Sequence, residues 1–138
     1  MPRYPTKKQI LAKEPEINIA TIEVTKLWKK LALKNWNKDS NYTKLGKLEM
    51  LLITIAETNQ RDQPSIFFGS EDKYDPSTQI ICLNASNPSI ISALHELGHY
   101  LLGSNELEAC RWSIWLFKEC FPVQYKKLEW KGHLLVKK

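Results

Sequence analysis

Residues 95–99 read His-Glu-Leu-Gly-His, and Glu106 follows in the stretch Glu-Leu-Glu-Ala at residues 106–109. Residues four apart on a helix lie on one face, so His95 and His99 can bind one metal ion together. Glu96 can then reach a water molecule on that ion and act as general base, as in the H-E-x-x-H arrangement of zinc proteases. The stretch therefore predicts a helix that carries a metal site, and it favours one Zn²⁺ ion.

A catalytic zinc ion usually takes three protein ligands and leaves the fourth position to water. The candidates for the third ligand are Glu106, Glu108 and Cys110. The helix face of Glu106 also carries small side chains, which would let its helix approach the motif helix closely: Ala109, Cys110 and Ser113. We assign Glu106 as the third ligand and keep Glu108 as the alternative. Cys110 is better placed to support the ligands than to bind the ion.

Peptide hydrolysis at such a site needs a hydrogen-bond donor for the oxygen that becomes negative during attack. The sequence offers Tyr100, Tyr125 and His133 as candidates and does not choose among them. Tyr100 directly follows the motif and is better suited to the core or its rim. His133 lies in the tail of the chain.

Two helices are expected before the motif. In residues 18–35 the apolar side chains recur at helical spacing, at Ala20, Val24, Leu27, Trp28 and Leu31. In residues 43–58 the apolar stripe consists of Leu45, Leu48, Leu52 and Ile55. Pro64 prevents any continuation of the second helix.

The remaining elements are short. Residues 65–69 and 79–84 have β character, and the turn signal at 75–77 between them favours an antiparallel pair. Asn87 or Ser89 would cap the motif helix, and Gly103 would end it. A further helix is expected at 106–119, followed by a possible strand at 133–136.

Composition fits a single small domain. The chain has 138 residues, of which 43% are hydrophobic and 25% are charged. We expect a flexible basic N-terminal arm at residues 1–15 and one domain at 16–138. The three cysteines form no disulfide framework, and the N-terminus has no apolar signal core, so we expect a cytoplasmic protein with reduced thiols.

Neither a membrane nor a nucleic acid is an expected partner. No apolar run is long enough to span a bilayer. The net charge of +5 comes from dispersed lysines and a basic tail, without a nucleic-acid-binding motif. A peptide or protein substrate remains as the expected partner.

The motifs resemble those of the gluzincin zinc peptidases, and most closely the ImmA/IrrE-type metallopeptidases. The resemblance covers residues 67–122 and rests on IICLN at 80–84, HELGHYLL at 95–102 and ELEACRWS at 106–113. It implies an α+β, zincin-like domain in which N-terminal helices precede a short twisted sheet, the motif helix and a glutamate helix. An edge strand of that sheet would align the peptide substrate. Cys110 departs from the family, which usually has Asn or Asp there.

Together these features predict a zinc-dependent endopeptidase in which Glu96 is the general base. The resemblance suggests that its substrate is a regulatory protein such as a repressor. The alternative is a zincin-fold binding or regulatory module with weak or no catalysis. The intact set of His95, Glu96 and His99 favours the enzyme, because a module without turnover has no need of the base.

Overall fold

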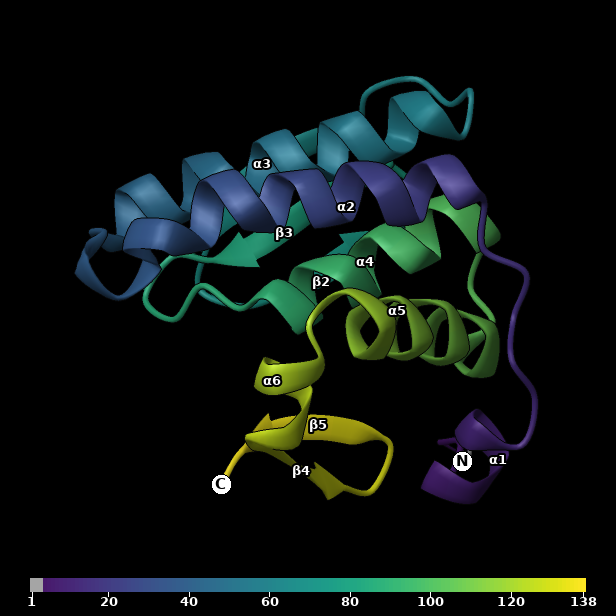
Figure 1. Ribbon diagram of the computed structural model, residues 1–138. Coiled ribbons are helices and arrows are strands. Elements are labelled where there is room, and N and C mark those ends of the chain that lie inside the picture. Colours follow the sequence, from purple (N-terminus) through teal and green to yellow (C-terminus); the bar gives the residue numbers. More distant parts are fainter. Residues whose placement is uncertain (1–3) are drawn as a thin grey trace.

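The computed structural model describes residues 4–138 and confirms the α+β class (Figure 1). The helical segments are α1 (Lys7–Leu11), α2 (Ile19–Ala32), the 3-10 helix η1 (Leu33–Lys38), α3 (Asn41–Thr58), α4 (Ile90–Leu102), α5 (Glu106–Cys120) and α6 (Pro122–Lys126). The strands are β1 (Ser65–Gly69), β2 (Lys73–Asp75), β3 (Ile80–Asn84), β4 (Leu128–Lys131) and β5 (Leu134–Lys137). Between Tyr4 and Lys138, no helix combines the length and hydropathy that a membrane crossing requires.

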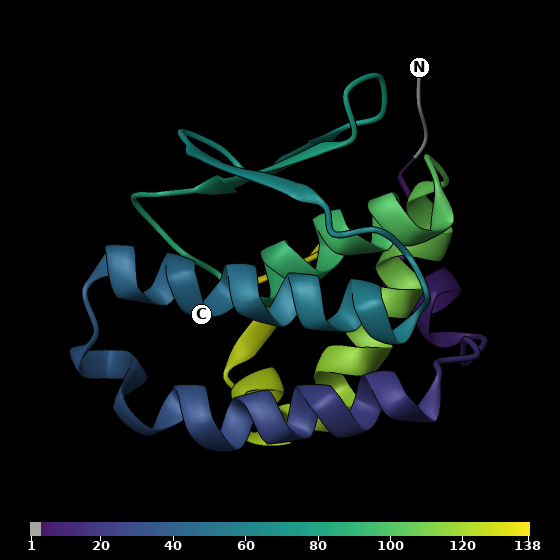
Figure 2. The same cartoon turned by 90° about the horizontal axis from the view of Figure 1, so that it is seen from above.

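Helices α2 and α3 lie side by side (Figure 2). Each begins at a polar cap: the side chain of Asn18 accepts a hydrogen bond from the Ala20 amide, and that of Ser40 accepts one from the Thr43 amide. The stripe predicted for α3 is confirmed, because its four apolar residues are all buried: Leu45, Leu48, Leu52 and Ile55. They form part of the main core.

The stripe predicted for α2 is wrong in part. Leu27 and Leu31 are 58% and 72% exposed, whereas Thr21 and Thr25 are fully buried. These threonines tolerate burial because their hydroxyls are hydrogen-bonded. The Thr25 hydroxyl donates to the Thr21 carbonyl at 2.7 Å, and the side-chain amide of Asn59 donates to Thr21 Oγ1 at 2.9 Å. Because these polar groups are hydrogen-bonded, the face of α2 that carries Thr21 and Thr25 packs inward, and the face that carries Leu27 and Leu31 is exposed to solvent.

The three-stranded sheet has the order β1-β3-β2. The antiparallel pairing predicted for residues 65–69 and 79–84 is wrong, because β1 and β3 pair in parallel. The predicted turn at 75–77 instead joins β2 to β3. Strand β2 pairs with β3 antiparallel. It is short and polar, and no sequence pattern predicts it. The Ser77 amide donates to Asp75 Oδ1 at 2.9 Å, which stabilises this turn.

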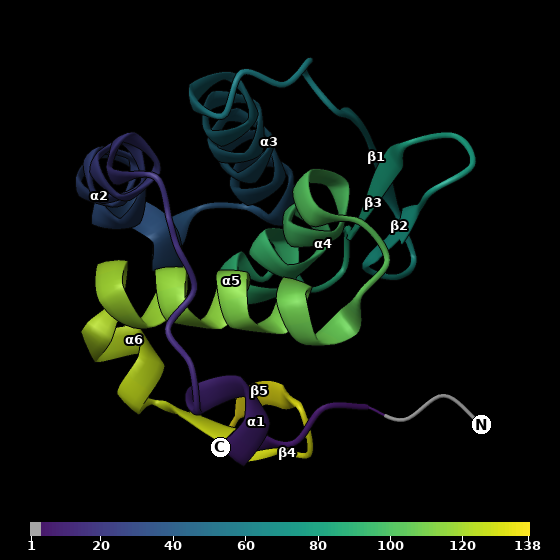
Figure 3. The same cartoon turned by 90° about the vertical axis from the view of Figure 1, so that its right-hand side faces the viewer.

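Helix α4 carries the 95–99 motif and lies between the sheet and α5 (Figure 3). The predicted close approach of α4 and α5 is confirmed. A Cβ atom at Gly98 would lie 3.2 Å from the carbonyl oxygen of Ala109, so a larger residue would push the helices apart. On the α5 side, Ala109, Cys110 and Ser113 are all buried.

The C-terminal segment adds a hairpin in which β4 pairs antiparallel with β5. The predicted strand at 133–136 corresponds to β5, shifted by one residue, whereas β4 had not been predicted. Figure 3 shows the hairpin and α1 on the far side of α5 from the sheet. The hairpin loop therefore reaches the 95–99 motif from the side opposite to the sheet (Figure 3).

The described part of the predicted N-terminal arm packs against α5. Ile10 is fully buried, and its carbonyl accepts a hydrogen bond from Trp115 Nε1 at 3.1 Å. The guanidinium of Arg111 donates to the Gln9 carbonyl at 2.7 Å. These contacts join residues far apart in the chain, which local composition does not reveal. Residues 1–3 of the predicted arm lie outside the described residues.

Candidate metal centre

His95, His99 and Glu106 converge at one point between α4 and α5. Glu106 Oε1 lies 2.8 Å from His95 Nε2, and Glu106 Oε2 lies 3.0 Å from His99 Nε2. One potential ligand atom from each residue lies within 4.8 Å of the others, which is compatible with a shared metal ion. The structure therefore brings together the three residues that the sequence assigns as ligands.

The turn between the two helices brings Glu106 to the histidines. Gly103 ends α4 with a φ of 98°, a conformation that side chains disfavour. Asn105 then caps α5 by accepting a hydrogen bond from the Glu108 amide at 3.0 Å. The connection between α4 and α5 is so short that Glu106, the first residue of α5, faces the last turns of α4.

The turn also orients His99. Its Nδ1 lies 2.9 Å from the Gly103 carbonyl oxygen, which can only accept, so Nδ1 carries the proton and donates. This hydrogen bond fixes the ring and directs Nε2 toward Glu106. Metal-binding histidines commonly donate their second ring N–H to a carbonyl in this way.

The two alternative ligands lie in different positions. Glu108 is exposed and lies outside the cluster. Cys110 is buried, with its Sγ 3.6 Å from Glu106 Oε1 and 3.9 Å from His95 Nδ1. Burial and the neighbouring Glu106 carboxylate raise the pKa of the Cys110 thiol, which favours the neutral form. The thiol thus touches two of the assigned ligands, in keeping with the supporting role expected for it.

Hydrogen bonds keep a negative charge beside the two histidines of the cluster. Hydrogen bonds from His95 and His99 lower the pKa of Glu106, so this carboxylate stays ionised. The hydrogen bond to Glu106 in turn raises the pKa of His99. A donor set of two imidazole nitrogens and one carboxylate oxygen is the set found in many catalytic zinc sites. The residues present therefore fit such an ion.

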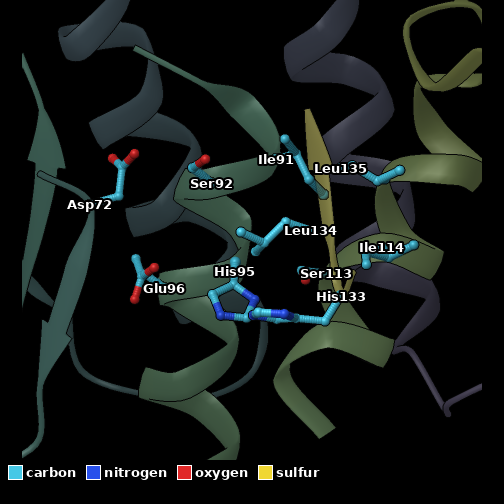
Figure 4. A pocket seen from close by; sticks show the side chains of 10 residues that line it. All are labelled: Asp72, Ile91, Ser92, His95, Glu96, Ser113, Ile114, His133, Leu134 and Leu135. Atoms are coloured by element: carbon cyan, nitrogen blue, oxygen red, sulfur yellow. The ribbon is translucent and has the colours of Figure 1, made fainter. Parts of the chain in front are cut away.

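A cavity of about 220 Å³ adjoins the cluster and is lined by His95, Glu96 and His133 among others (Figure 4). Within residues 4–138, no hydrogen bond or ion pair engages the Glu96 carboxylate. Burial raises the pKa of Glu96 and of Asp72, a second carboxylate in the same cavity that the sequence had not indicated. Figure 4 shows these two carboxylates near the sheet, with His133 and the hairpin opposite.

Only His133, of the three candidate hydrogen-bond donors, lies in this cavity. Its Nε2 is 4.0 Å from Glu106 Oε1, and its ring stacks on Tyr4 at a centroid distance of 4.4 Å. The hydroxyl of Tyr100 already donates to the Asp62 carbonyl at 2.8 Å, and Tyr125 does not line the cavity. Since Tyr4 and His133 lie at opposite ends of the chain, sequence spacing could not pair them.

Comparison with models of protein families, with curated proteins and with solved structures gave no match for this chain. The resemblance to the ImmA/IrrE-type metallopeptidases therefore stays a prediction from the motifs.

Proposed function

We propose that this protein is a zinc-dependent endopeptidase. The observation that carries the proposal is the cluster of His95, His99 and Glu106 beside a cavity into which Glu96 projects without a partner among residues 4–138. A purely structural metal site uses four protein ligands and has no need of a free carboxylate. A hydrolytic site needs both an open position and a base.

The proposed mechanism assigns a separate task to each group. His95, His99 and Glu106 would hold the ion, which when bound lowers the pKa of water and polarises the scissile carbonyl. Glu96 takes the proton from the attacking water and passes it to the leaving amine. Burial raises the pKa of Glu96, which makes its carboxylate a stronger base for the proton that it accepts and returns.

The edge of the sheet offers a place for the substrate backbone. Strand β2 pairs only with β3 among the described strands, so its outer edge is unpaired. Asp72, the residue before β2, lines the cavity, and its Oδ1 accepts a hydrogen bond from the Asn84 amide at 2.8 Å. An extended peptide added to β2 as a further strand would run beside the cluster. The resemblance to the ImmA/IrrE-type metallopeptidases favours a regulatory protein as the substrate that supplies this peptide segment.

Removal of the metal is the direct test of this proposal. The zinc-loaded protein is incubated with a peptide library derived from whole-cell protein, and new termini are identified by mass spectrometry. We expect new termini with the zinc-loaded protein, their loss after chelation and their return when zinc is restored. Stoichiometric zinc without any new termini would instead favour the binding module.

Replacement of His133 tests the proposed hydrogen-bond donor. We expect His133→Ala to lower the rate of cleavage by roughly 10²–10³-fold, the usual cost of losing one donor to a developing oxyanion. Zinc content should not change, because the assigned ligands remain. His133→Gln, which keeps an N–H donor, serves as the matched control and should recover part of the rate. A rate that rises in His133→Ala would mean that the hairpin covers the site.

A further inference from the structure

A second hollow lies between α2 and the end of α5, and we call it the basic groove. Its volume is about 660 Å³. Its lining residues are Lys26, Leu27, Lys29, Lys30, Leu33, Glu119, Cys120, Pro122 and Gln124. On α5, Glu119 lies 13 residues beyond Glu106, or roughly 20 Å at 1.5 Å per residue. The groove is therefore a different surface from the metal centre.

The groove has an unpartnered apolar rim. Leu27 and Leu31 are one turn apart on α2 and are 58% and 72% exposed. Val123, next to Pro122 and Gln124 of the lining, is 57% exposed. Single exposed apolar residues are common, but several large ones gathered around a hollow are typical of a contact surface. The spacing of the two leucines suits a helix laid along the groove.

The charge of the groove is positive, because three lysines face a single glutamate. Lys26 pairs with Glu119 at 3.7 Å, and the Lys29 ammonium lies 5.7 Å from the centre of the Phe121 ring. Lys30 is exposed and has no ion-pair partner in the described part of the chain. An occupant with carboxylates would complement this charge and be steered toward it.

The mixed lining of the groove narrows the chemistry of the occupant. Nucleic acids and lipid headgroups would meet the lysines with phosphates, but neither would use the exposed leucines and the recessed groove together. A polypeptide supplies carboxylates and apolar side chains at once.

We propose that the basic groove binds an acidic amphipathic helix of a partner protein. The apolar face of that helix packs on Leu27 and Leu31, and its carboxylates pair with the lysines. This interaction does not depend on the proposed peptidase activity, since it uses the other end of α5.

A labelled synthetic peptide tests the proposal with the full-length protein. The peptide has about four helical turns, with leucine at alternating three- and four-residue spacing and glutamate at most other positions. We expect saturable binding by fluorescence anisotropy. We also expect amide chemical-shift changes at residues 26–33 and 119–124 that leave residues 95–106 unaffected. A peptide with lysine in place of glutamate should bind at least about tenfold more weakly.

Two matched pairs of variants locate the site. Leu31→Asp should weaken binding by about tenfold or more, whereas Met50→Asp, at an apolar position 62% exposed on α3, should not. Lys30→Glu should also weaken binding, whereas Lys13→Glu should not. The proposal is overturned if the acidic peptide does not bind, if Leu31→Asp binds it equally well, or if only an oligonucleotide or anionic vesicles bind.

Discussion

The variant Glu96→Gln is expected to keep its zinc and to lose peptide hydrolysis almost completely. The carboxylate of Glu96 lines the cavity but is not one of the three convergent ligand residues, so its replacement leaves the metal donors in place. An amide of the same size cannot take a proton from water. General-base catalysis typically contributes about 10²–10⁴ to a rate, and we expect a loss of this order.

The measurement compares metal content and product formation in the same preparations. Zinc is determined by elemental analysis, and cleavage is followed by mass spectrometry on the substrate found with the unaltered protein. Glu108→Gln is the control, because Glu108 is an exposed glutamate of the adjoining helix outside the cluster. Equal hydrolysis by Glu96→Gln and the unaltered protein would exclude Glu96 as the base.

The cluster of His95, His99 and Glu106 could be predicted because its geometry is almost entirely local. Helical spacing brings His95 and His99 to one face, and a short turn through Gly103 brings Glu106 to them. These contacts join residues only a few positions apart, and the positive φ of Gly103 sets the turn between them. Ala109, which faces Gly98, is one of the small residues that the sequence predicts on the face of Glu106, where close helix packing requires them.

The parts that could not be predicted depend on contacts between distant segments. Leu27 and Leu31 are exposed because the opposite face of α2, which carries Thr21, is buried. The hydroxyls on that face are hydrogen-bonded, by the Asn59 side chain and within α2. The sheet order depends on β2, whose three residues carry no apolar alternation. His133 reaches the cavity only because the C-terminal hairpin folds back across α5.

The variant Glu106→Ala is expected to lose stoichiometric zinc. Glu106 provides the single carboxylate of the cluster, and hydrogen bonds from both histidines keep it ionised, so its loss removes the negative charge of the donor set. Residues that only support a ligand typically change metal affinity by about 10–100-fold. Loss of a ligand should exceed that range, and we expect the affinity to fall by at least about a hundredfold. Competition with a chromophoric chelator measures the dissociation constant.

Glu108→Ala provides the matched control, because it removes the same side chain two residues further along α5 from an exposed position. We expect its zinc affinity to stay within about twofold of that of the unaltered protein, since solvent screens the effect of an exposed charge. Glu106→Gln separates charge from shape, because it keeps an oxygen donor at the same position without the negative charge. If Glu106→Ala still binds one zinc ion with unchanged affinity, Glu106 is not the third ligand, and a side chain such as Cys110 or His133 must complete the site.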